Sequence, residues 1–237
     1  MSFDLHELDR QYDSGSSRQT LEQYTAFTFL WMFLGLMITF GTCLLLYMTG
    51  FHFVILSVPG LHLGLLIAEL IVVIAMSRQV SKLSVNSARG LFIAYSLLNG
   101  LTFSSVLFVY GLANVIYVFG LTALYFGALA AYGYFAKVDL SRLRNILLFG
   151  LIFLIIAGVL LMFFPIAQLD KIVCMIGIVI FLAYTAYDTQ KIRSFYEHYA
   201  QDQQALQAAS IYSALQLYLD FINLFLYLLR FLGSKKN

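Results

Sequence analysis

Seven apolar segments, each close to the length needed to cross a lipid bilayer, constrain the fold of this 237-residue chain more than any other feature. A transmembrane helix needs about 20 mainly apolar residues, and runs that are continuous rather than alternating argue against strands. The segments are expected at 25–48, 59–76, 91–110, 115–136, 146–164, 172–187 and 209–231. We therefore predict an all-α polytopic membrane protein with seven transmembrane helices in one domain, 25–231, between a polar tail (1–24) and a short C-terminal tail (232–237).

Composition supports a lipid environment. Hydrophobic residues make up 61% of the chain and charged residues 11%, more apolar surface than a soluble domain of this size can bury. The net charge of +2 gives no reason to expect a nucleic-acid partner. The polar tail lacks the basic and apolar regions of a cleaved signal peptide, so the first spanning helix is expected to direct insertion.

The distribution of Lys and Arg predicts the orientation. Ten of the 14 lie in the tail or in loops on one side: Arg10, Arg18, Arg78, Lys82, Arg89, Lys137, Arg142, Arg144, Lys191 and Arg193. The opposite loops hold Lys171, so the amino terminus is predicted to be cytoplasmic. Arg230, Lys235 and Lys236 pull the C-terminal tail inward, which leaves a re-entrant last segment as the alternative to a full crossing.

A small-residue face is also expected on the fourth segment. Gly127 and Ala131 lie four residues apart, and Gly133 follows them. Small residues at this spacing allow close contact between helices, and ordinary packing is the simplest explanation of them.

Two aspartates in the last two segments are the main candidates for chemistry. The polar sequence QDQQ at 201–204 is the natural place for the chain to reverse, and 204 is the midpoint between Asp188 and Asp220. A turn centred there would put both carboxylates at one height, roughly 24 Å from the turn, if both helices continue to it. Two carboxylates that meet in a low-dielectric place share a proton or a cation. The alternative for Asp188 is a helix-end carboxylate in the headgroup region, unless its helix continues toward residue 200.

Other polar residues lie near membrane depth. Glu69 sits among apolar residues of the second segment, and its simplest explanation is a protonated carboxyl that donates one hydrogen bond to a neighbouring helix.

Arg78, at the end of that segment, could pair with Asp188 and release it on protonation, although a lipid-phosphate contact is the simpler expectation. Lys191 and Arg193 are expected to be of the same kind. Asn223 and Tyr187 lie close in sequence to the aspartates, and Tyr187 could supply a hydroxyl donor.

Enzymatic motifs are absent from the sequence. The four histidines do not have metal-ligand spacing, and no HExxH, GxSxG or phosphate-binding glycine loop occurs. We predict a protein that is not an enzyme and has no tightly bound cofactor.

Several motifs in this chain resemble those of the Bax-inhibitor (TMBIM-type) family of membrane proteins. They are YDTQKI in the sixth segment, LYLDFINLFLYLLRF in the seventh, NGLTFSS in the third and the glutamate within the second. The resemblance covers 24–231 and implies a seven-helix fold with the last helix central. It also implies a proton-sensitive calcium leak in which Asp188 and Asp220 form the pair, with Glu69 toward the pore. An arginine after the second segment pairs with the aspartates in the family, and Arg78 is the match here. The compact loops look like those of bacterial members, which implies the bacterial inner (plasma) membrane.

Two functions of different classes are therefore expected. The leading one is a pH-sensitive passive Ca²⁺ leak, in which Asp188 and Asp220 supply oxygen ligands to the permeating ion. The alternative is a regulator without transport of its own, which binds a membrane protease or a cell-death or stress partner through the tail and exposed helix faces. An aspartyl-protease-like use of the pair is a weaker third possibility.

Overall fold

The computed structural model describes residues 19–58, 60–78 and 84–233, and all regular structure in these ranges is helical. The helices are α2 (Leu21–Met48), α3 (His52–Ser57), α4 (Leu61–Arg78), α5 (Val85–Tyr110), α6 (Leu112–Phe135), the 3₁₀ helix η1 (Leu140–Leu143), α7 (Arg144–Phe163), α8 (Ala167–Tyr199) and α9 (Gln203–Leu232). The prediction of an all-α protein is confirmed for the described residues.

Six of the described helices are long and apolar enough to cross a membrane: α2, α5, α6, η1 with α7, α8 and α9. Helix α4 is the shorter one, and its 18 residues would extend through roughly 27 Å of a hydrocarbon core of about 30 Å. The predicted number of seven crossings therefore depends on α4. Because α9 is one continuous helix of 30 residues, it is not a re-entrant segment.

The α8–α9 hairpin is longer than the apolar pattern predicts. Helix α8 continues to Tyr199, twelve residues beyond the predicted end at 187, because its last turns carry an exposed polar face. The chain reverses in the expected polar segment. There Asp202 caps α9 by accepting hydrogen bonds from the backbone N–H groups of Gln204 and Ala205, at 2.9 and 3.0 Å.

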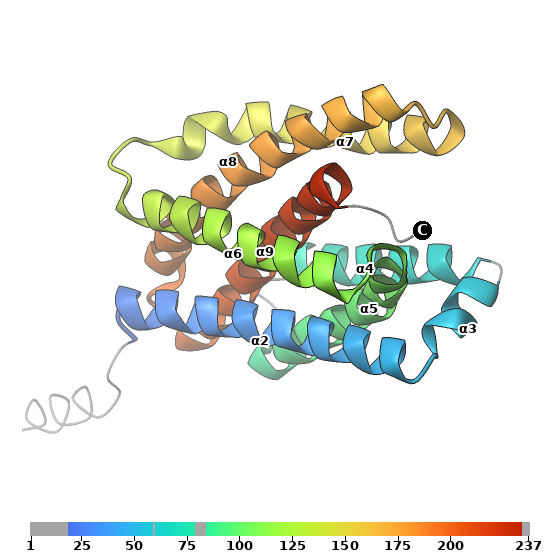
Figure 1. Cartoon of the computed structure of the whole chain (residues 1–237). Helices are drawn as coiled ribbons and strands as arrows, with labels where there is room; N and C mark the ends of the chain where they lie inside the picture. Colours follow the sequence, from blue (N-terminus) through green and yellow to red (C-terminus); the bar gives the residue numbers. More distant parts are fainter. Residues whose placement is uncertain (1–18, 59, 79–83, 234–237) are drawn as a thin grey trace, which may run out of the picture.

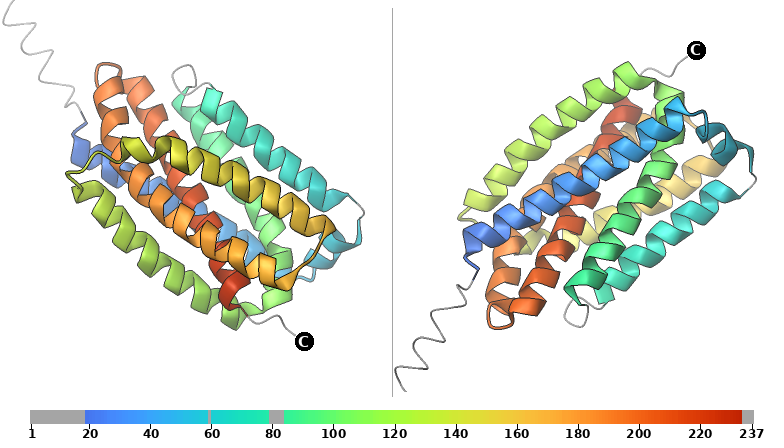
Figure 2. Two further views of the ribbon diagram at one scale, coloured as in Figure 1. Left: turned by 90° about the horizontal axis from the view of Figure 1, so that it is seen from above. Right: turned by 90° about the horizontal axis from the view of Figure 1, so that it is seen from below.

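Helix α9 is the centre of the molecule (Figures 1 and 2). It packs against α8, α2, α6 and α5, whereas α4 packs chiefly on α5 and α7 chiefly on α8. Its large side chains Leu217, Tyr218 and Leu224 are completely buried. An acidic residue on α9 is therefore surrounded by other helices rather than by lipid.

Close contact between helices occurs at selected glycines. A Cβ at Gly133 of α6 would lie 2.3 Å from the backbone oxygen of Ala186 on α8. A Cβ at Gly127 would meet no heavy atom within 4 Å. The predicted small-residue face thus makes a tight helix crossing at Gly133, while Gly127 faces open space.

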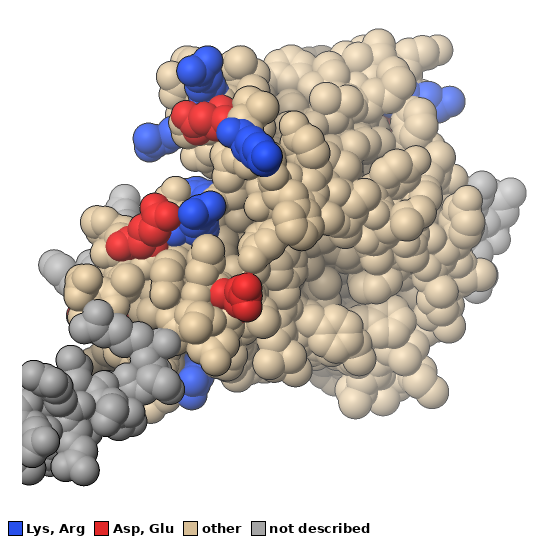
Figure 3. Space-filling model, turned by 90° about the vertical axis from the view of Figure 1, so that its left-hand side faces the viewer, with Lys and Arg blue, Asp and Glu red and all other residues tan. Residues whose placement is uncertain are grey.

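Charged side chains gather at one end of the bundle, the end at which α2 begins and α6 and α8 finish (Figure 3). Lys137, Arg142, Arg144 and Arg193 belong to this end, in agreement with the predicted grouping of basic residues in the loops. At the other end Arg230 of α9 forms an ion pair with Asp170 of α8. The α8–α9 pair is therefore linked by polar contacts near both of its ends.

We expect Gly133→Ala to destabilise the protein by about 1–3 kcal/mol, because the added methyl group meets backbone that side-chain rotation cannot move. Gly120→Ala on the same helix is the matched control, since its Cβ meets nothing within 4 Å. Thermal unfolding in detergent measures both. Equal melting temperatures for the two variants would contradict the close α6–α8 crossing.

Candidate functional site

Asp188 and Asp220 are brought together by the register of the α8–α9 hairpin. Near the turn, the ring of Phe195 packs against Tyr212 at 5.8 Å. One turn further along both helices, Lys191 Nζ donates to Gln216 Oε1 at 3.5 Å. The next step along each helix reaches the two aspartates, as the sequence predicts from the position of the turn.

The two carboxyl groups lie close enough to interact with each other across the α8–α9 interface. Both are buried, with 8% of Asp188 and 4% of Asp220 exposed. A hydrogen bond between two carboxyl groups needs a proton on one of them, because an ionised carboxylate is an acceptor only. One oxygen of each group, Asp188 Oδ1 and Asp220 Oδ2, has no hydrogen-bond partner among the described residues. The pair therefore keeps acceptor capacity that a cation could use.

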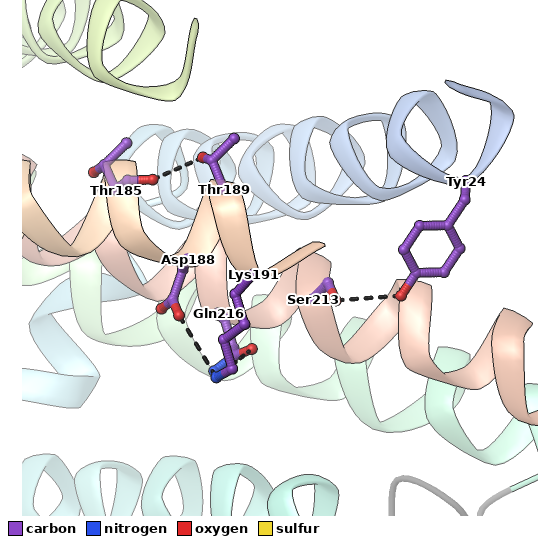
Figure 4. A network of polar contacts seen from close by, with 7 residues as sticks. All are labelled: Tyr24, Thr185, Asp188, Thr189, Lys191, Ser213 and Gln216. Atoms are coloured by element: carbon purple, nitrogen blue, oxygen red, sulfur yellow. Dashed lines mark hydrogen bonds and ion pairs between the residues drawn. The ribbon is translucent and has the colours of Figure 1, made fainter. Parts of the chain in front are cut away.

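Among the described residues, the cation at this pair is Lys191. The sequence predicts that Lys191 contacts lipid headgroups, whereas in the structure it pairs with Asp188. Its Nζ lies 3.7 Å from Asp188 Oδ1, and Figure 4 shows Asp188 and Lys191 of α8 converging with Gln216 of α9. The ammonium group also lies 5.8 Å from the centre of the Tyr187 ring and 5.1 Å from that of Phe195. These rings and Gln216 hold the lysine against the hairpin.

The predicted Arg78 contact falls outside what the structure describes. Arg78 ends α4, and its side chain is not among the described groups. The preceding residue, Ser77, donates to the Val73 carbonyl of its own helix at 2.8 Å and lies near Tyr212, the residue one turn before Gln216 on α9. The Arg78 latch therefore stays a prediction.

Glu69 is separate from the pair. Its Oε1 accepts a hydrogen bond of 2.7 Å from the hydroxyl group of Thr102 on α5. A hydrogen bond to a neighbouring helix is therefore present, but Thr102 donates it, whereas the sequence predicts the Glu69 carboxyl to be the donor. Among the described residues, no group of three or more His, Cys, Asp or Glu side chains gathers, so Glu69 does not join the aspartates.

A second polar cluster surrounds Tyr218 of α9, two residues before Asp220. The Tyr218 hydroxyl lies 2.6 Å from the hydroxyl of Thr39, which donates to the Ser96 carbonyl at 2.9 Å. The ring of Tyr95 packs on Tyr218 at 5.7 Å. Sequence reasoning missed this cluster, because Thr and Ser within apolar segments also satisfy themselves within their own helix.

The remaining predicted residues have local roles. The Asn223 side chain donates to the Leu219 carbonyl of its own helix at 2.8 Å. Tyr187 supplies an aromatic face to Lys191, and among the described residues its hydroxyl makes no hydrogen bond to an aspartate. Lys191 and Gln216 are the site residues that the sequence reasoning missed. The signal for Lys191 was its position three residues after Asp188, which puts both side chains on one helix face.

Comparison with known proteins agrees with the fold and with the motifs. The family profile described as inhibitor of apoptosis-promoting Bax1 matches residues 21–237. This chain belongs to that Bax-inhibitor family. The match includes both aspartates and the whole described bundle apart from its first two residues.

Bacterial relatives of this Bax-inhibitor family member cover from about three quarters to more than nine tenths of its length. Inner membrane protein YbhL of Escherichia coli K12 is 39% identical over 221 residues, 92% of this chain and 94% of YbhL. An uncharacterised protein of Deinococcus radiodurans is 38% identical over 224 residues, 93% of this chain and 95% of its own. An uncharacterised protein of Borreliella burgdorferi is 38% identical over 175 residues, 74% of this chain and 75% of its own.

We expect the shared proton to be visible by infrared spectroscopy. In a Glu69→Gln background, which removes the intramembrane acid outside the pair, a protonated-carboxyl band should be present at neutral pH. Asp220→Asn should abolish it, because the amide donates to Asp188 without an extra proton. Glu22→Gln, an exposed change in the first turn of α2, should leave the band unchanged. Absence of the band in the Glu69→Gln protein itself would show that the pair holds no proton.

Proposed function

We propose that this Bax-inhibitor family protein is a pH-sensitive passive calcium leak channel, gated by the Asp188–Asp220 pair. The observation that carries the proposal is the contact of two buried carboxyl groups across the α8–α9 interface, one of them on the central helix. A charged group at this depth is costly unless it is paired, so its charge state is coupled to the packing of the two helices.

Charge balance gives the gate its two states. With one proton and Lys191, the two carboxyl groups are electrically balanced. Loss of the proton removes the hydrogen bond between α8 and α9 and leaves one negative charge without compensation. A permeating cation can then take the place of the proton. The ion pair of Asp188 with Lys191 lies within α8, so its rupture alone would not separate the helices.

The chemistry of the available ligands favours a hard cation. Asp188 Oδ1, Asp220 Oδ2 and Gln216 Oε1 are oxygen atoms, the ligand type that Ca²⁺ prefers. Asp188 Oδ1 and Gln216 Oε1 contact Lys191, so an entering cation would displace the lysine ammonium from them. Three protein oxygens are fewer than the 6–8 ligands of a tight calcium site. This arrangement suits an ion that passes through with part of its water shell rather than a resident metal.

We further propose the inner membrane as the location, as the name of YbhL says of that protein. The basic end of the bundle would face the cytoplasm by the positive-inside rule, with the amino terminus on the same side. The carboxyl pair then lies toward the cytoplasmic mouth, and Asp170 with Arg230 lies at the opposite end.

The test is calcium flux into liposomes that contain the purified protein, with the pH varied from 6 to 8. We expect flux to rise with pH, because the shared proton that joins the helices is lost. Asp220→Asn should remove the pH dependence, since its amide keeps the hydrogen bond at every pH, while Glu22→Gln should retain it. The proposal fails if Asp220→Asn follows the pH profile of the parent.

Removal of residues 2–18 separates transport from a role that depends on a partner such as a membrane protease. The truncation must leave Gln19 and Thr20, because the Gln19 carbonyl accepts from Tyr196 at 2.9 Å and Thr20 caps α2. We expect calcium flux within about twofold of the parent. Equal calcium flux into empty liposomes and into protein-containing liposomes at every pH would instead favour the regulator without transport of its own.

A further inference from the structure

An apolar groove of about 630 Å³ runs between α2 and α6. Both helices pack on α9, and they meet each other through long side chains such as Phe40 and Phe119, whose ring centres are 6.2 Å apart. The groove is lined mainly by Phe, Met and Leu side chains of α2 and by the small residues Gly127 and Ala131 of α6. Its floor includes Phe221, the neighbour of Asp220 on α9.

A polar chamber of about 430 Å³ continues from one end of this groove. Thr25 of α2 and Tyr134 of α6 line both cavities, so the two spaces adjoin. The chamber lies at the charged end of the bundle in Figure 3. Its charged lining residues are Lys137, Asp139, Arg193 and Glu197, two of each sign.

The wall of the chamber is held in place by Gln190 of α8. Its side-chain amide donates to the carbonyl groups of Ala136 and Val138, at 3.3 and 2.8 Å, and accepts from the Leu140 N–H at 2.8 Å. These three bonds fix the segment that follows α6 and carries Lys137. The chamber is therefore formed by the fold itself.

We infer that the groove and chamber together bind one phospholipid with a zwitterionic headgroup that ends in a primary ammonium, as in phosphatidylethanolamine. An acyl chain occupies the groove between α2 and α6. The phosphate lies near Lys137, and the ammonium lies near Asp139.

The dimensions agree with a lipid of one leaflet. From Thr25 to Met37 the groove follows twelve residues of α2, roughly 18 Å at the rise of a helix. One leaflet contributes about half of a hydrocarbon core of about 30 Å. A chain that starts at the headgroup level therefore fills the groove along its length.

The charges in the chamber select the headgroup. Arg193 is already paired with Glu197 at 3.2 Å, whereas Lys137 has no ion pair among the described residues. The Ser141 backbone N–H donates to Asp139 Oδ1 at 2.9 Å, and hydrogen bonding from Ser141 lowers the pKa of Asp139. Balanced charges of both signs suit a zwitterion better than a net anion. An ammonium that donates hydrogen bonds also suits the carboxylates better than a choline group.

The experiment is native mass spectrometry of delipidated protein titrated with phosphatidylethanolamine, phosphatidylcholine or phosphatidylglycerol in detergent. We expect one phosphatidylethanolamine per chain, bound at least tenfold more tightly than either of the other lipids. Gly127→Leu, which grows into the groove, should lower this binding at least tenfold. Gly120→Leu is the matched control, because Gly120 also faces open space on α6 but does not line the groove.

A second variant tests the headgroup without a change in the helices. Asp139→Asn, which keeps an oxygen to accept from the Ser141 N–H, should reduce the preference for phosphatidylethanolamine over phosphatidylcholine, while binding of the acyl chain remains. Equal binding of all three lipids to the parent would overturn the inference, and so would equal binding to Gly127→Leu and Gly120→Leu. A protein dimer that Gly127→Leu abolishes, with no lipid retained by the parent, would assign the groove to a second copy and would also overturn it.

Discussion

The contact between two acidic side chains on neighbouring membrane helices is the constraint on which the rest of the structure depends. A buried carboxylate is costly, and two in contact cannot both be ionised without a compensating positive charge. The fold supplies Lys191 from the same helix as Asp188 and places Gln216 opposite to orient it. This arrangement exists because α9 is surrounded by α8, α2, α6 and α5, which keep water and lipid away from Asp220.

The helices and the aspartate pair could be predicted from the sequence, because both follow from local rules. Apolar runs of bilayer length predict spanning helices, and the polar residues 201–204 predict the reversal that sets Asp188 opposite Asp220. The end of α8 at Tyr199 was harder to predict, because the length of an apolar run indicates how much of a helix lies in the membrane and not how long the whole helix is. The role of Lys191 could not be separated from a headgroup contact, since both environments lie at the end of an apolar run. The groove was hidden because Gly127 and Gly133 have the same local pattern but opposite surroundings.

Polar contacts at both ends of the α8–α9 hairpin give these two helices a defined register. Arg230 and Asp170 form an ion pair at one end, and Lys191 with Gln216 links the helices at the other. In lipid, helices gain little from apolar contact with each other, so packing and polar contacts decide which faces meet. In the proposed gate, a change of protonation at the aspartates would act on one end of a hairpin whose other end is held by Asp170 and Arg230. Rotation or tilting of α8 about the Asp170 contact would then follow more readily than separation along the whole interface.

The groove between α2 and α6 reaches the same region from the side of the lipid. Its floor residue Phe221 adjoins Asp220 in the chain and packs against Phe119 and Phe126 of α6, at 5.1 and 5.5 Å between ring centres. An acyl chain in the groove would thus press on the part of α9 that carries the carboxyl group. Because α9 is packed on several sides, a displacement of Phe221 changes the contact of Asp220 with α8 unless the neighbouring helices move as well. The bound lipid and the proton would then act on one element, the central helix, from two of its faces.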